Sequence, residues 1–321
     1  MSFFWLTVCL ALLLFGAVNA LGSLFVVLLY RRRLASRGPR TAARSILLRR
    51  LIPAALSLFF VAALFLPAFL RYEPRETDER VSASLLALAA GGALVLLAGP
   101  VRALQASLAT HHLARGWERN ASPASLPGLD IPAWIVEETF PIVTVVGILR
   151  PRLYIARQVV DGCTRTELEA IAAHEAGHLK NRDNLKRLLL RSLPDWISLI
   201  PRASRMERVW ARAIEEDADD HAARAAGSLD LASALLKVAR MVSLPPPRHL
   251  SAHLYGEGGT AWRVERLLGA PGLYASSCAR RVALWPPIFF GLLACAPLIA
   301  LCLGLNSSIH ALAEAIVQLL Q

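Results

Sequence analysis

Two histidines and a glutamate stand at a spacing that can bind a metal ion and activate water. They lie in the stretch His174-Glu175-Ala176-Gly177-His178. Residues four apart share one face of a helix, so His174 and His178 can bind the same ion. Glu175 follows the first histidine directly and can reach a water on that ion as general base. A surface helix with two chance histidines would read the same over five residues, so the flanking sequence has to decide.

The flanking residues predict a helix. Thr164-Arg165-Thr166-Glu167 is a capping box, in which the threonine side chain and the glutamate side chain each satisfy a free backbone N–H of the first turn. Leu168, Ile171 and Ala172 then follow at helical spacing into the histidine motif. The metal-binding interpretation is therefore favoured over the chance one.

A catalytic zinc ion takes three protein ligands and keeps one open position, so a third ligand is needed. The acidic run Glu215-Glu216-Asp217-Ala218-Asp219-Asp220 begins 37 positions after His178 (215 − 178). It lies in a second predicted helix, roughly Met206 to Ala226, which Gly227 ends. An acidic, solvated helix face is the alternative interpretation of such a run.

Helical spacing leaves two candidate pairs in this run. They are Glu215 with Asp219 and Glu216 with Asp220. Either pair could supply one ligand and, one turn later, a carboxylate that orients a ligating histidine. Periodicity alone does not choose between them.

The combined pattern resembles the gluzincin membrane peptidases. The pattern is His174-Glu175-x-x-His178 with Asp183 close behind, followed by Glu215-x-x-Ala218-Asp219. It is most similar to the BlaR/MecR-type antirepressor metallopeptidases, and next to the HtpX and CAAX-prenyl-protease group. Upstream, Phe140-Pro141 and the segment from Gly147 to Ile155 are similar too, so that the resemblance spans nearly the whole chain.

This resemblance selects among the carboxylates. It implies that His174, His178 and Glu215 are zinc ligands and that Glu175 is the catalytic base. It also implies that Asp219 lies behind a ligating histidine and orients it.

The composition indicates a membrane protein. Of 321 residues, 55% are hydrophobic, and the mean hydropathy is +0.46, which is too apolar for a soluble domain of this size. About 20 helical residues cross a hydrocarbon core of roughly 30 Å. Four apolar runs are about this long: Phe3–Tyr30, Leu51–Leu70, Val81–Ala98 with its continuation towards Leu104, and Val282–Gly304. The first could be a cleaved signal peptide, but no basic residue precedes it and it continues past Ala20, so we expect a retained span.

The arginines predict the orientation in a cell membrane. The loop between the first two runs carries eight arginines and no acidic residue, whereas acidic residues outnumber arginines between the second and third runs. The positive-inside rule then places loop 31–50 in the cytoplasm and both termini outside. The net charge of +11 is assigned largely to this loop facing lipid headgroups, and no nucleic-acid binding is expected. The five cysteines form no CxxC pair, so no disulfide framework or thiolate zinc site is expected.

The predicted fold is a mainly α membrane protein with four transmembrane helices. Residues 1–104 would hold three spans and the basic loop. Residues 105–281 would form a cytoplasmic α+β gluzincin-like zinc peptidase domain, and residues 282–321 the fourth span and a short tail. Within the domain, Ile142 to Ile155 is predicted to be a strand pair or a bent strand. Its part near Gly147 to Ile155 could hold an extended substrate by backbone pairing, or it could be an ordinary sheet strand. Asn184 to Trp210 is predicted to be a helical hairpin that lies either against the membrane or between the zinc-bearing helices. His249 or His253 could stabilise an oxyanion, although a surface position is the more ordinary one for a loop histidine.

The resulting functional prediction is a membrane zinc metalloendopeptidase. Zn²⁺ is the expected cofactor, the lipid bilayer and a regulatory membrane protein are expected partners, and a cytoplasmic transcriptional repressor is the expected kind of protein substrate. Only 17 residues (321 − 304) follow Gly304, so we expect no penicillin-binding sensor domain and no antibiotic sensing. Two alternatives remain open: an HtpX-like quality-control protease, and a non-catalytic sensor or scaffold that keeps zinc for structure.

Overall fold

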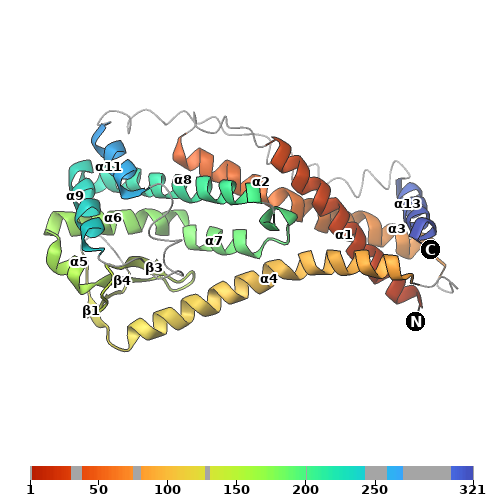
Figure 1. Ribbon diagram of the computed structural model, residues 1–321, viewed down its shortest axis with the longest axis horizontal. Helices are drawn as coiled ribbons and strands as arrows, with labels where there is room; N and C mark the ends of the chain where they lie inside the picture. Colours follow the sequence, from red (N-terminus) through yellow and green to blue (C-terminus); the bar gives the residue numbers. More distant parts are fainter. Residues whose placement is uncertain are drawn as a thin grey trace.

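The computed structural model describes residues 2–29, 38–74, 81–126, 131–199, 201–242, 259–269 and 305–320. Within these ranges the chain is mostly helical with one small sheet (Figure 1). The expected fourth span, residues 282–304, lies outside the described residues, and so do His249 and His253.

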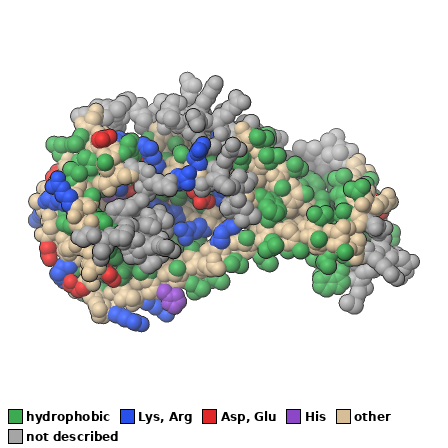
Figure 2. Space-filling model, viewed as in Figure 1, with side chains coloured by type: hydrophobic (Ala, Val, Ile, Leu, Met, Phe, Trp, Pro, Cys, Tyr) green, Lys and Arg blue, Asp and Glu red, His purple; other side chains and the backbone are tan. Residues whose placement is uncertain are grey.

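Three long apolar helices form the elongated half of the molecule. They are α1 (Ser2–Leu29), the continuous run of α2 (Pro39–Phe59), the π-helical turns Phe60–Phe65 and α3 (Leu66–Tyr72), and α4 (Ala83–Glu118). Each is long and apolar enough to cross a membrane. In Figure 2, charged side chains gather over the half of the molecule that holds the sheet. The coloured side chains seen on the elongated half are mostly hydrophobic. This is the arrangement of a membrane protein.

The ends of the long helices differ from the ends of the apolar runs in the sequence. α2 begins at Pro39, so residues 39–50 of the expected basic loop 31–50 are helical. Proline suits the first turn of a helix, and one arginine of this stretch, Arg50, is 1% exposed and pairs with Asp195 at 3.3 Å. α4 continues to Glu118, so the domain boundary expected at 104/105 falls inside one helix. Hydropathy detects the apolar part of a helix but not where its backbone hydrogen bonding stops.

A four-stranded sheet lies beside the far end of α4. Its order is β1 (Ser122–Ala124), β2 (Ala133–Val136), β4 (Arg152–Ala156) and β3 (Val143–Val146). β2 and β4 are parallel, and the other two pairs are antiparallel. The expectation that a substrate pairs with the strand from Gly147 to Ile155 therefore needs correction. Its β4 part is an inner strand whose backbone pairs on both sides, and β3 is the edge strand next to it.

Helices surround this sheet and carry the candidate site. They are α5 (Arg157–Gly162), α6 (Arg165–Asn181), α7 (Asp183–Ser192), the 3₁₀ turn Trp196–Leu199, α8 (Pro201–Ala226), α9 (Ser228–Met241) and α11 (Gly259–Gly269). At the other end of the rod, α13 (Leu305–Leu320) packs on α3 through Ala313 and Val317. What was predicted to be a short tail thus contains a packed helix.

The segment after α7 is fastened to the first apolar helix by polar contacts. Asn19 of α1 is fully buried, and its Nδ2 donates to the carbonyl of Pro194 at 2.7 Å. Trp196 donates its backbone N–H to Asn19 Oδ1 at 3.2 Å and its indole N–H to the Gly16 carbonyl at 3.1 Å. Nearby Leu190, Leu193 and Ile197 are buried. The 184–210 stretch thus packs largely on the apolar helices α1 and α4, and not between the two zinc-bearing helices as one of its two expected placements had it.

Close packing of α1 on α4 depends on a glycine. A Cβ added to Gly92 would lie 1.9 Å from the Leu12 carbonyl oxygen, and Gly16 meets the same point from the other helix. Its neighbour Gly91 has no atom within 4 Å of the corresponding position. Small residues let helices approach closely in a bilayer, where van der Waals packing stabilises their association.

This pair of glycines gives a matched test of the helix packing. Gly92→Ala should destabilise the protein by about 1–3 kcal/mol or more, because backbone atoms cannot yield to the methyl group. Gly91→Ala should be neutral or stabilise by up to about 1 kcal/mol, since alanine is the better helix former. Thermal unfolding in one detergent measures both. Equal melting temperatures for the two variants would contradict the α1–α4 contact.

Candidate metal centre

The helix that carries the histidine motif is fixed at its start by a capping box. Thr164 Oγ1 accepts from the Glu167 N–H at 3.3 Å, and Glu167 Oε2 accepts from the Thr164 N–H at 2.7 Å. Lys237 of α9 also donates to Glu167 at 2.7 Å. Ala170 and Ala172 follow and are buried, so that this face of α6 packs into the core. The sequence prediction of this helix start is confirmed.

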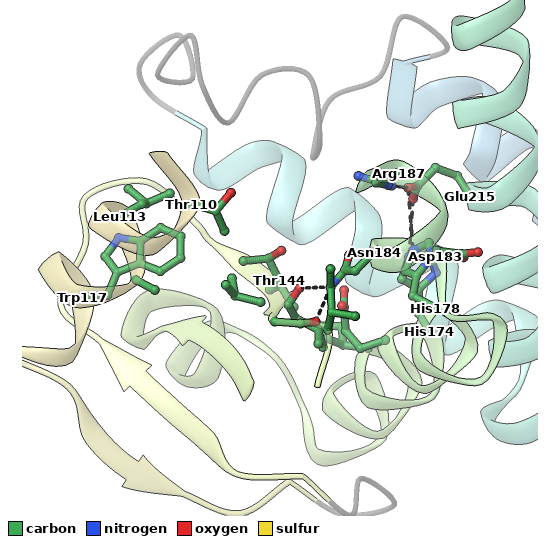
Figure 3. Close-up of a pocket in the computed structure, with 18 of the residues that line it drawn as sticks. Thr110, Leu113, Trp117, Thr144, His174, His178, Asp183, Asn184, Arg187 and Glu215 are labelled. Atoms are coloured by element: carbon green, nitrogen blue, oxygen red, sulfur yellow. Dashed lines mark hydrogen bonds and ion pairs between the residues drawn. The ribbon is translucent and has the colours of Figure 1, made fainter. Parts of the chain in front are cut away.

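The two histidines and Glu215 converge on one point. The Nε2 atoms of His174 and His178 are 3.2 Å apart, and they lie 3.5 and 3.7 Å from Glu215 Oε2 and Oε1. Ligands about 2.0–2.1 Å from a tetrahedral ion are about 3.3 Å from one another. The three side chains therefore have the donor types and nearly the spacing that a zinc ion requires (Figure 3).

Glu215 reaches this point because α6 and α8 pack closely. A Cβ on Gly177 would lie 3.2 Å from the Ala218 Cα, so a glycine here lets the two helices approach. Glu216, the member of the other candidate pair, instead accepts from Arg212 at 3.1 Å on its own helix. Of the two registers that periodicity left open, the one with Glu215 faces the histidines.

Each histidine is held from behind by a carboxylate. His174 Nδ1 lies 3.0 Å from Asp219 Oδ1, and His178 Nδ1 lies 2.9 Å from Asp183 Oδ2. Both aspartates are almost fully buried. Such contacts fix the ring orientation and leave Nε2 facing Glu215, where it could bind a metal ion.

Sequence reasoning gave no role to Asp183. It stands five residues after His178, which would point it to another face if the helix continued. The chain instead turns at Arg182, a left-handed residue with φ 54° and ψ 43° that ends α6 and precedes α7. The turn folds Asp183 back onto the histidine. A non-glycine residue in this conformation gives no sequence signal.

Two arginines also were not predicted. Arg263 of α11 donates to both oxygens of Asp219 at 2.9 and 2.6 Å, and it lies 3.5 Å from Glu215 Oε2. Arg187 of α7 donates to Glu215 Oε1 at 3.3 Å. An arginine in a helix normally indicates a solvated face, so the flanking sequence does not identify either arginine as part of the site.

The charges of the site explain its protonation. Burial alone would lower the pKa of His174 and His178, but the carboxylates of Asp219, Asp183 and Glu215 raise both above their ordinary value. Burial would raise the pKa of Glu215, but the histidines and Arg263 hold it well below its usual range. A metal ion would therefore displace protons from the imidazoles, and its affinity should rise with pH.

A cavity of about 1100 Å³ opens on this centre. Thr110 and Leu113 of α4 line one side and the edge strand β3 another, and His174, Glu175 and Glu215 lie in its wall. Glu175 is only 8% exposed. The catalytic-base candidate thus faces the same space as the predicted ligands.

Comparison with known proteins supports a peptidase. Residues 145–203 match the model of peptidase family M48, a segment that includes β4 and the whole histidine motif. The match supports a gluzincin-type metallopeptidase. It does not identify the BlaR/MecR-type subfamily. No curated protein matches the chain, and no solved structure does.

Glu167 gives a test of how the motif helix is held. Burial would raise its pKa, but Lys237, Ser233 and the Thr164 N–H together lower it to about 2. A depressed pKa adds stability above the ordinary value near 4.5, and that stability is lost as pH falls towards 2. Glu167→Gln should destabilise by about 1–3 kcal/mol at pH 7 and flatten the acid side of the stability curve. Glu169→Gln, on an exposed turn of the same helix, should change neither. Identical acid unfolding of wild type and Glu167→Gln would exclude this role.

Proposed function

We propose that this chain is a membrane zinc metalloendopeptidase. His174, His178 and Glu215 would bind zinc, and Glu175 would act as the general base. The observation that carries the proposal is the convergence of two Nε2 atoms and a carboxylate within 3.2–3.7 Å, with a buried aspartate behind each imidazole. A purely structural site would have no use for a carboxylate such as Glu175 facing an open cavity.

The residues divide the chemistry among them. Zinc, when bound, would supply the Lewis acid that polarises the scissile carbonyl and lowers the pKa of the attacking water. Glu175 would take the proton from that water and pass it to the leaving amine. Asp183 and Asp219 would hold the imidazoles in the tautomer that exposes Nε2. Arg263 would keep Asp219 ionised and in place through its two hydrogen bonds.

The substrate would bind as an extended chain against β3. In the antiparallel pair, Ala156 N–H bonds to Ile142 O, so the backbone groups of Val143 and Val145 face away from β4. Asn184 already donates to the carbonyls of Val145 and Gly147. Substrate pairing would therefore use the Val143 half of the strand, and apolar side chains would enter the cavity lined by α4.

The wider role we propose is regulated cleavage of a cytoplasmic protein, such as a transcriptional repressor. The arginine-rich segment at the start of α2 supports a cytoplasmic position for the peptidase part. The resemblance of the sequence motifs to antirepressor peptidases supports a repressor as the substrate.

Loss of the general base should separate chemistry from metal binding. Glu175→Gln should keep one equivalent of zinc and lose at least about 100-fold in hydrolysis of an unfolded reporter protein such as labelled casein. Glu169→Gln on the same helix should cleave normally. Undiminished cleavage by a fully zinc-loaded Glu175→Gln protein would contradict the assignment.

The aspartates behind the histidines should control metal affinity. Asp183→Ala and Asp219→Ala should each weaken zinc binding by about 10- to 100-fold. Glu216→Ala, which removes the carboxylate next to Glu215, should leave zinc affinity unchanged. Competition with a zinc chelator measures all three. Loss of zinc from Glu216→Ala with retention in Asp183→Ala would mean that the register is wrong.

The wider role is tested in cells. Comparing proteins in cells that carry wild type or Glu175→Gln should reveal one or two intact cytoplasmic proteins accumulating in the variant. Broad accumulation of misfolded membrane proteins would instead support the quality-control alternative. No difference under any stress would support the scaffold.

A further inference from the structure

A second group of metal-binding side chains lies at the opposite end of the molecule. Glu73 follows α3, and His310 and Glu314 lie on α13. Glu73 Oε2 is 3.7 Å from His310 Nδ1, and Glu314 Oε1 is 4.0 Å from His310 Nε2. One ligand atom from each of the three lies within 4.8 Å of the others. Among the described residues, this group and the His174 centre are the two that could hold a metal ion.

The histidine is held in place but makes no hydrogen bond to either carboxylate. Both separations exceed hydrogen-bond length. His310 Nδ1 is buried and has no hydrogen-bond partner in the part of the chain that the structure describes. The rings of Phe69 and Tyr72 lie 6.2 and 5.9 Å from the imidazole centre and confine it.

The ring of His310 and the two carboxylates beside it lie where they could share a cation. A neutral imidazole has one N–H, so it can donate to only one of the two carboxylates that flank it, and the other oxygen then faces a nitrogen lone pair. Glu73 has only 2% of its side chain exposed, so it does not turn freely to water. A divalent cation bound to that lone pair would lie within reach of both carboxylates.

We propose that Glu73, His310 and Glu314 form a second metal site that binds a divalent first-row ion such as Zn²⁺. One imidazole and two carboxylates are ligands that zinc accepts, and no thiolate is needed. Glu314 is 32% exposed, so its carboxylate can rotate inwards and water can complete the coordination. The ion would fasten α13 to the end of α3, far from the His174 centre (Figure 1).

The test uses the full-length protein in detergent with His174→Ala and His178→Ala, which removes the first centre. Zn²⁺ alone is titrated by calorimetry. We expect one equivalent to bind, with a rise in melting temperature. Adding His310→Ala should weaken this binding at least 100-fold, and Glu314→Gln, which keeps side-chain size, should weaken it about 10-fold or more. Adding His111→Ala, which changes an exposed histidine of α4, should have no effect.

The outcomes separate this site from the proposed active site. No stoichiometric zinc in the His174→Ala/His178→Ala protein would overturn the second site, and so would binding that His310→Ala does not change. Neither result bears on catalysis. Conversely, an inactive wild type would leave the second site standing if the titration behaves as expected. Co²⁺ substitution adds a spectroscopic readout, because His310→Ala should abolish the visible absorption of the bound ion.

Discussion

The buried contact of His174 and His178 with Glu215 is the constraint on which the half of the molecule around the candidate metal centre depends. Two imidazole nitrogens and a carboxylate stand within 3.2–3.7 Å in a largely buried place. Buried polar groups of this kind are costly unless each is paired. The surrounding structure supplies the pairing. α6 and α8 meet at Gly177, the turn at Arg182 brings Asp183 behind one histidine, and α11 delivers Arg263 to Asp219.

The apolar helices and the metal centre form one packed unit. α7 begins at Asp183, whose carboxylate contacts His178. The segment that follows α7 is hydrogen-bonded to Asn19 of α1. A fully buried asparagine in an apolar span is expensive unless it has partners, and here its partners come from the peptidase half. Arg50 does the same from α2 through its contact with Asp195. The position of His178 is therefore tied to the packing of the spans.

Local features of the fold and site were predictable from the sequence. The capping box at Thr164, the helical spacing of His174 and His178, and the length of the apolar runs each depend on neighbours within a few residues. The choice of Glu215 over Glu216 did not follow from spacing, because both registers fit a helix equally. It came from the family resemblance, and its physical cause is the close approach of α6 to α8.

What escaped prediction depends on contacts between distant segments. Asp183 is next to His178 only because Arg182 adopts a left-handed conformation, and Arg263 arrives from a helix 48 positions after Glu215 (263 − 215). The order of the strands could not be read from their composition, so the sequence left open which strand forms the edge that β3 occupies. The start of α2 was misplaced because arginines form helices well and one of them is buried by an ion pair rather than solvated.

The most direct test of the metal centre is X-ray absorption at the zinc edge. The sample is the His310→Ala protein loaded with one equivalent of zinc, so that a single environment is measured. We expect four light-atom ligands at about 2.0–2.1 Å, two of them with the outer-shell scattering of imidazole. Substituting Glu215→Ala should remove one oxygen or release the metal. Sulfur scattering near about 2.3 Å, or a spectrum without imidazole, would contradict it.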